Sequence, residues 1–283
     1  MRSLRQPAVA GHFYPDDRPT LERDLDSYLA ADSKAPAGAT PVRYPDAVAC
    51  IVPHAGYMYS GHVAGAVYGR LAPQPTYIVI GPNHRGYGEP LALMSSGAWL
   101  TPLGEVPLDA ALARSVQQGC PWLTDDAEAH AGEHSLEVQI PFLQRIARDF
   151  TMLPIVLGVD DLETLENLGH AVAAAIRTSS RPVFMVASSD MNHYEPDGIT
   201  RLKDSKAIDR ILQLDAAGLY ETVFRERISM CGFAAATAML VAAWDLGARR
   251  AELVRYATSA DRGGPRDAVV GYAGIVVRRG QKS

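Results

Sequence analysis

The sequence predicts an α/β fold of three layers, with a largely parallel or mixed sheet covered by helices on both faces. Two observations predict it. Apolar runs of strand length alternate with segments of helical periodicity, and three of these runs lead directly into polar loops that carry histidine. The chain has 283 residues, 47% of them hydrophobic, which is enough for a large core. We therefore expect one domain over residues 1–283.

Each element follows from the local pattern. Leu21, Leu25 and Leu29 share one face and predict a helix over Thr20–Ala30, and the Ala-, Pro- and Gly-rich Ala31–Thr40 predicts a loop. Strand and helix signals then alternate: a strand at Val48–Val52, a helix at His62–Leu71, a strand at Tyr77–Ile80, the apolar segment Leu91–Met94, helices at Leu108–Gln117 and Ser135–Ala147, a strand at Met152–Leu157, a helix at Leu162–Ile176, a strand at Val183–Ala187, helices at Asp204–Tyr220 and Phe233–Leu246, and strands at Glu252–Thr258 and Val269–Val277. Only a short loop separates the last two strands, so we expect them to pair antiparallel at an edge.

Composition and charge exclude several classes of protein. The net charge is −5, with no polybasic run, which argues against nucleic-acid and anionic-membrane partners. The N-terminus lacks the apolar core of a secretory signal, and no stretch approaches the roughly 20 apolar residues that span a bilayer. Three widely spaced cysteines argue against a disulfide framework. We expect a soluble cytoplasmic protein.

Three loops at strand ends carry side chains that could bind a metal ion or take part in catalysis. They are Pro53–Tyr57, which contains His54, Gly81–His84, and Ser188–His193. In open α/β sheets, ligands bind beyond the carboxyl ends of the strands, so these loops predict one polar site. His54 and His84 form half of a transition-metal site, because neutral imidazole binds iron, copper, zinc and nickel. The alternative for a single such histidine is that it only caps its turn.

Further candidates lie on the same and on later segments. Asp190 and His193 are three residues apart, so one can orient groups while the other acts as an acid or base; alternatively, Asp190 caps a short turn. His134 and Glu137 open a helix and can reach toward the site. Taken alone, Glu137 is typical of an acidic residue in a first turn whose charge only interacts favourably with the helix dipole. Cys231 precedes an alanine-rich helix, where a thiolate is favoured, but by composition it is more often a small buried residue.

Taken together, these segments resemble the Memo family, whose prokaryotic members are called AmmeMemoRadiSam system protein B. The resemblance runs almost from end to end. Seven motifs in order carry it: Arg5–Pro15, Pro53–Tyr57, Gly81–His84, Glu133–Leu143, Ser188–His193, Cys231-Gly232 and Tyr256–Ser259.

The resemblance implies a fold similar to class III extradiol dioxygenases, which use non-haem iron. It implies that His54, His84 and Cys231 form the metal pocket, that Asp190 and His193 line it, and that His193 acts as an acid or base. The prokaryotic family name also implies a radical-SAM protein and an AMMECR-type protein as pathway partners.

Three functional hypotheses follow. The leading one is a mononuclear metal-dependent oxidoreductase that uses iron, with copper and zinc as alternatives; His193 would move protons, and Asp190 and His134 would orient groups. A small-molecule substrate would enter beside Tyr57, Tyr59 and Tyr194. The second is a non-catalytic module that binds a peptide or partner in the same crevice, and the third is a zinc hydrolase. Since iron oxygenases usually use two histidines and a carboxylate, a cysteine ligand does not imply catechol-type cleavage.

Overall fold

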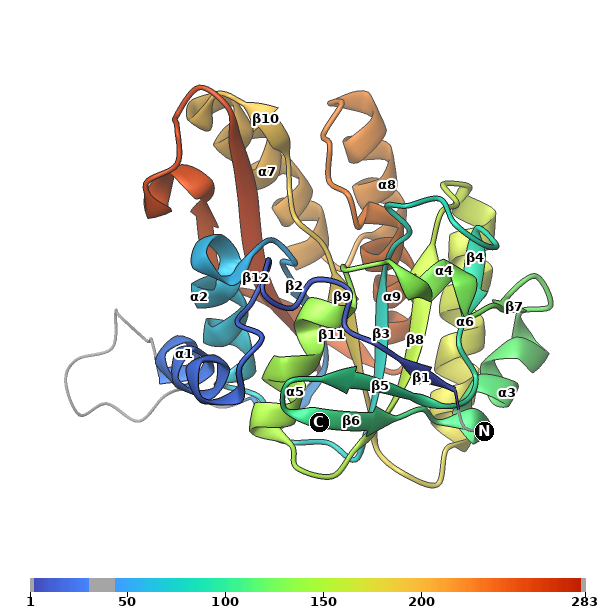
Figure 1. Cartoon of the computed structure of the whole chain (residues 1–283). Helices are drawn as coiled ribbons and strands as arrows, with labels where there is room; N and C mark the ends of the chain where they lie inside the picture. The colour runs from blue at the N-terminus through green and yellow to red at the C-terminus, as the bar shows by residue number, and fades with distance from the viewer. Residues whose placement is uncertain (1–2, 31–43, 281–283) are drawn as a thin grey trace.

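A computed structural model describes residues 3–30 and 44–280 (Figure 1). Within these residues the central sheet has nine strands, in the order β10-β12-β2-β9-β3-β8-β4-β7, with β11 also paired to β12. The sequence-predicted loop Ala31–Thr40 lies outside the described residues. The strands are β2 (Ala47–Val52), β3 (Thr76–Pro82), β4 (Leu91–Leu93), β7 (Thr124–Asp125), β8 (Thr151–Leu157), β9 (Val183–Ser188), β10 (His193–Glu195), β11 (Ala248–Thr258) and β12 (Val269–Arg279).

The four middle strands of this sheet are parallel, and the strand that flanks them on each side is antiparallel to them. Strands β2, β9, β3 and β8 lie side by side in one direction. Strand β12 runs antiparallel to β2, β4 antiparallel to β8, and β11 antiparallel to β12. The prediction of a largely parallel, mixed sheet is therefore confirmed, as is the antiparallel pairing of the last two strands.

Helices cover both faces because successive residues of the middle strands point to opposite sides. In β3, Ile78 and Ile80 belong to one hydrophobic cluster, whereas Tyr77 and Val79 belong to the other. The first cluster packs against α3 (Ala110–Gly119), α6 (Leu162–Thr178), α7 (Asp197–Leu212), α8 (Ala216–Arg225) and α9 (Phe233–Asp245). The second packs against α1 (Arg18–Ala30), α2 (Tyr57–Tyr68) and α5 (Ile140–Ile146).

A smaller sheet, which the sequence did not predict, covers part of the second cluster. It contains β1 (Leu4–Arg5), β5 (Ala98–Thr101) and β6 (Gly104–Pro107), in the order β1-β5-β6. Trp99 and Val106 bury their side chains in that cluster. Short single-turn elements complete the described chain: α4 (Glu128–Ala131), η1 (Glu137–Gln139) and η2 (Ser259–Arg262).

One predicted helix is broken into two. The pattern over Asp204–Tyr220 predicted a single helix, but α7 ends at Leu212 and α8 begins at Ala216. Leu214 has a φ of 57°, a left-handed conformation that cannot continue a right-handed helix. Asp215 then starts α8, because its carboxylate accepts a hydrogen bond from the Gly218 N–H at 2.9 Å.

Two other helices begin at different residues than predicted, because of contacts with distant segments. Helix α2 begins at Tyr57 rather than His62, and the Tyr57 N–H donates to the Phe13 carbonyl at 2.8 Å. The predicted helix Ser135–Ala147 contains α5, which begins only at Ile140 after the 3₁₀ turn η1. The Ser135 carbonyl instead accepts a hydrogen bond from the Ser188 hydroxyl at 2.6 Å.

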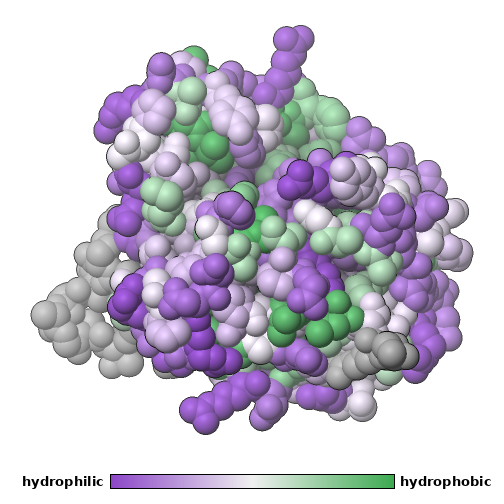
Figure 2. Space-filling view, in the orientation of Figure 1, coloured by the Kyte–Doolittle hydropathy of each residue, from purple (hydrophilic) through white to green (hydrophobic). Residues whose placement is uncertain are grey.

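No helix in residues 3–30 and 44–280 is both long and apolar enough to cross a bilayer. Figure 2 shows that hydrophilic residues spread over the face in view and that hydrophobic residues form separate patches on it.

A buried carboxyl group joins α7 to the loop after β9 and to β11. Asp204 accepts hydrogen bonds from the Asn192 N–H at 2.9 Å and from the Tyr256 hydroxyl at 2.7 Å. Burial raises the pKa of Asp204 to about 7, although the bond from Tyr256 opposes this. The folded state therefore holds this proton more tightly than the unfolded chain does.

This assignment predicts a pH-dependent effect of Asp204→Asn. Ionisation of the wild-type carboxyl in the folded state costs stability as the pH rises from about 4 to about 7. The free energy of unfolding of the variant, relative to wild type, should rise by up to about 1.4 kcal/mol per pH unit in this window and then level off. Urea denaturation between pH 5 and pH 8 measures it, and a difference that does not vary with pH would contradict the assignment.

Candidate metal centre

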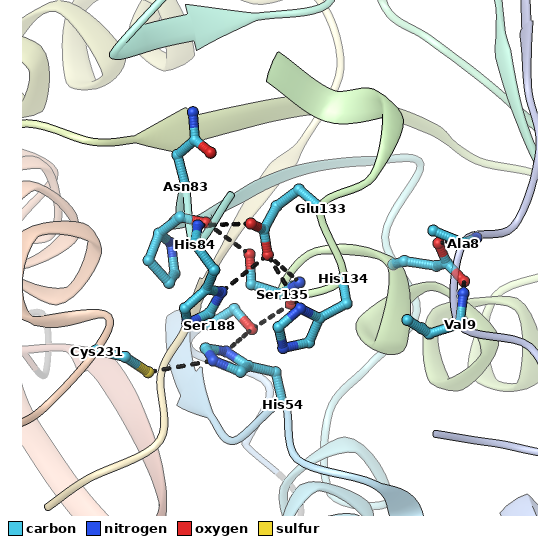
Figure 3. A network of polar contacts seen from close by, with 12 residues as sticks. Ala8, Val9, His54, Asn83, His84, Glu133, His134, Ser135, Ser188 and Cys231 are labelled. Carbon is cyan, nitrogen blue, oxygen red and sulfur yellow. Dashed lines mark hydrogen bonds and ion pairs between the residues drawn. The ribbon is translucent and has the colours of Figure 1, made fainter. Parts of the chain in front are cut away.

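The topology of the sheet brings the three polar loops together. His54 follows β2, His84 follows β3, and Asp190 follows β9, which lies between those two strands. Because the three strands are parallel, their carboxyl ends meet at one edge of the sheet. Cys231 reaches the same place from the turn that precedes α9 (Figure 3).

Two imidazoles and one thiol converge at this edge. Each of His54, His84 and Cys231 offers a ligand atom, and these atoms all lie within 4.8 Å of one another. His54 Nε2 is 3.2 Å from Cys231 Sγ, and the two imidazole centroids are 5.1 Å apart. Imidazole nitrogen and thiolate sulfur are ligands for zinc, copper and iron, so this group can hold a metal ion.

A buried carboxylate orients His84. Glu133 accepts from the backbone N–H of His84 at 2.6 Å and from its Nδ1 at 3.0 Å (Figure 3). Burial by itself would raise the pKa of Glu133, but hydrogen bonds from His84 and Ser135 and the nearby His134 lower it to about 2. The ionised carboxylate keeps the proton of His84 on Nδ1 and leaves Nε2 free, an arrangement that is common behind metal-binding histidines.

The other histidines around the site are also held through Nδ1. His54 Nδ1 lies 3.0 Å from the Ser188 hydroxyl, and His193 Nδ1 donates to the Ser229 carbonyl at 2.8 Å. His134 Nδ1 is 3.4 Å from the Glu133 carboxylate, and its ring stacks on His84 at a centroid distance of 4.7 Å. In each of these rings, Nδ1 thus lies next to a polar group of the protein.

Burial sets the charge of two residues of the metal group. It lowers the pKa of His54, and the neighbouring His84 and His134 lower it further, so this imidazole is neutral. Burial, together with the charge of Asp190, raises the pKa of the Cys231 thiol. Since a metal ion displaces a thiol proton on binding, a metal ion held here would release a proton from Cys231.

Asp190 holds the turn that presents His54. One carboxylate oxygen accepts the backbone N–H groups of His54 at 2.8 Å and Ala55 at 3.3 Å. The Asp190 N–H in turn donates to Cys231 Sγ at 3.3 Å. Burial raises the pKa of Asp190, an effect that the nearby His193 opposes. Asp190 thus contacts two members of the metal group and caps no helix.

A cavity of about 630 Å³ opens beside these residues. Tyr194 lines this cavity, and 77% of the residue is exposed. Tyr57 does not line it, because it is buried and its hydroxyl donates to the Val138 carbonyl at 2.6 Å. The cavity is lined by Phe13, His54, Ala55, Gly56, His84, His134, Asp190, His193, Tyr194, Ser229, Cys231 and Val270.

Glu137 has a role that its place near a helix start did not indicate. Its carboxylate is fully buried and pairs with Arg5 at 2.6 Å and with the Tyr14 hydroxyl at 2.6 Å. It also accepts the backbone N–H groups of Ala8 and Val9. These bonds fix the N-terminal segment and so bring Phe13 to the cavity. The quoted motif Arg5–Pro15 contained these residues, but nothing in it assigned them to the site.

The fold and the site together define a class: an α/β protein with a candidate two-histidine, one-cysteine metal centre at the carboxyl edge of parallel strands. Residues 5–276 match the family model described as Memo-like protein. The chain belongs to the Memo family, as its motifs indicated.

Full-length relatives support this membership. A MEMO1 family protein of Pyrobaculum arsenaticum is 44% identical over 279 residues, which cover 98% of this chain and 99% of the relative. One from Methanosarcina barkeri is 42% identical over 275 residues, or 97% of this chain and all of the relative. One from Archaeoglobus fulgidus is 43% identical over 275 residues, with the same coverage.

The position of Glu133 behind His84 predicts the effect of Glu133→Gln. An amide offers one acceptor oxygen where the carboxylate offers two, so His84 loses part of its support. We expect the affinity for Co²⁺, measured by competition with a chelator, to fall about 10- to 100-fold. Glu163→Gln, an exposed change on α6, is the matched control and should bind as wild type does. Equal affinities of the two variants would show that Glu133 does not support the site.

Proposed function

We propose that this protein is a metal-dependent oxidoreductase with one metal ion, iron, held by His54, His84 and Cys231. The single observation that carries the proposal is the convergence of these three ligand atoms within 4.8 Å. Copper and zinc are the alternative metals. We also propose that the fold is of the class III extradiol dioxygenase type, to which its parallel strands and strand-end site are suited.

The chemistry of the donor set supports a metal ion at this place. Burial favours the neutral form of His54, its Nδ1 has a hydrogen-bond partner, and the same holds for the Nδ1 of His84. When bound, iron would supply one-electron redox chemistry beside a cavity large enough for a small substrate. Because Cys231 takes the place of a carboxylate ligand, we do not extend the proposal to ring cleavage of catechols.

The remaining residues of the cavity would contact the substrate or hold the metal ligands in place. His193 is held by the Ser229 carbonyl through Nδ1, so its Nε2 can accept or release a proton at the cavity. Asp190 would keep His54 in place through its backbone bonds, and His134 would support His84 by stacking. The ring of Phe13 packs on that of His134, with a distance of 4.8 Å between the ring centroids. Together with Tyr194, Phe13 would contact the apolar part of a small aromatic or polar substrate.

Metal analysis tests the ligand set. Protein purified without oxygen should contain about one iron per chain, and Cys231→Ser and His84→Ala should each lose most of it, because two protein ligands hold iron weakly. His170→Ala is the control, since His170 is an exposed histidine of α6 that pairs with Asp245. Inductively coupled plasma mass spectrometry gives the metal content. Wild-type metal levels in the two ligand variants would refute the assignment.

The role of His193 is tested by separating turnover from metal content. His193→Ala should retain nearly all its iron and lose turnover by two or more orders of magnitude, as expected for a general acid or base. Oxygen consumption by the iron-loaded protein, with ascorbate as electron donor, is the measurement. If iron and turnover fell together, His193 would be a structural residue and the proposed role would be wrong.

A second candidate function is a non-catalytic module that binds a peptide or partner protein in the same cavity. The observation that favours it is the exposed ring of Tyr194, which with Phe13 and Val270 gives the cavity an apolar margin. This candidate predicts no oxygen consumption with any metal loaded. A zinc hydrolase would differ from both, since it would be purified with zinc and would act without oxygen.

A further inference from the structure

The hydroxyl group of Ser188 has three polar neighbours deep behind the metal centre. Ser188 is the last residue of β9 and is fully buried. Its oxygen is 2.6 Å from the Ser135 carbonyl, 2.7 Å from the Gln139 side-chain nitrogen and 3.0 Å from His54 Nδ1. A serine hydroxyl has one proton to donate and two lone pairs that accept. Only one distribution of protons satisfies all three contacts.

The orientation of the Gln139 amide is fixed by groups on either side of it. Its nitrogen is 2.9 Å from the Pro53 carbonyl, which can only accept, and its oxygen is 3.0 Å from the Tyr68 hydroxyl. The Tyr68 hydroxyl therefore donates to the amide oxygen. The amide nitrogen donates to Pro53 with one proton and to Ser188 with the other.

The proton of Ser188 then has one destination. The Ser135 carbonyl can only accept, so the Ser188 hydroxyl donates to it while accepting from Gln139. The second lone pair of Ser188 is left for His54, which must carry its proton on Nδ1. The opposite tautomer would take the Ser188 proton and leave the Ser135 carbonyl without that donor, and it would aim an N–H at the Cys231 sulfur.

We propose that Ser188, oriented by Gln139 and the Ser135 carbonyl, is a positioning residue that holds His54 as the Nδ1–H tautomer. The lone pair of Nε2 then faces Cys231 Sγ, 3.2 Å away, where the metal ion would bind. The two histidine ligands are thus fixed in different ways, His84 by a charged carboxylate and His54 by a neutral hydroxyl. The tautomer claim concerns the metal-free protein, and only its consequence for affinity rests on the proposed function.

The tautomer can be measured directly in the wild-type protein. Long-range ¹H–¹⁵N correlation spectra of the metal-free, ¹⁵N-labelled full chain distinguish the protonated from the unprotonated ring nitrogen, and His54→Gln identifies the signals. We expect His54 to carry its proton on Nδ1 at neutral pH. A proton on Nε2 would overturn the proposal. This measurement requires no variant of Ser188 to fold.

Substitution of Ser188 tests the consequence for metal binding. Ser188→Ala should give a mixture of His54 tautomers and bind Co²⁺ about 10- to 100-fold more weakly, whereas Ser188→Thr keeps the hydroxyl and should stay close to wild type. The control is Thr237→Val, which removes a buried hydroxyl that has no hydrogen-bond partner among the described residues. Unchanged tautomer and affinity in Ser188→Ala would overturn the proposal.

The two proposals fail in different ways. A wild-type protein that binds neither Co²⁺ nor iron would refute the oxidoreductase, while the tautomer of His54 would still be decided by the metal-free spectra. A wild-type protein that binds metal but carries the His54 proton on Nε2 would refute only the role of Ser188.

Discussion

Polar side chains buried behind the candidate metal centre need partners, and this constraint organises the molecule around that site. The side chains of Glu133 and Glu137 have no exposed surface. Glu137 is satisfied by the N-terminal segment and Glu133 by the loop after β3. Removing one partner of the buried ion pair between Arg5 and Glu137 would cost about 3–5 kcal/mol. The N-terminal segment, the strand-end loops and the turn η1 are therefore held together as one unit.

The two histidines of the site have hydrogen-bond partners of different charge. A carboxylate behind His84 raises the electron donation of that ring, whereas the hydroxyl behind His54 adds no charge near the buried thiol of Cys231. Asp190 connects His54 to Cys231, because it binds the backbone of His54 through its carboxylate and Cys231 Sγ through its N–H. Loss of the Asp190 side chain would therefore alter the positions of both His54 and Cys231.

Much of the sheet was predictable because its middle strands are buried on both faces and appear in the sequence as continuous apolar runs. The run Tyr77–Ile80 became β3 at Thr76–Pro82, and Val183–Ala187 became β9 with one residue added. The short strands β1, β5 and β6 were missed, since two to four residues carry too little pattern. The starts of α2 and α5 also differed, because partners far along the chain determine them.

The site, like the sheet, was predictable from the sequence only in part. The strand-end pattern indicated His54 and His84. Cys231 by itself was more typical of a small buried residue, and only the family resemblance made it the expected ligand. The structure places its sulfur 3.2 Å from His54 Nε2. Gln139 and Ser188 carried no signal as supporting residues, because their function lies in contacts between segments 49 or more positions apart. Such contacts have no local sequence pattern.

We propose that two imidazoles and one sulfur hold the metal ion. X-ray absorption spectroscopy of the iron-loaded protein tests it most directly, because sulfur and nitrogen scatter differently in the nearest shell of the metal. We expect one sulfur and two imidazoles bound to iron in the wild-type protein, and loss of the sulfur in Cys231→Ser. A shell of only nitrogen and oxygen in the wild-type protein would contradict it.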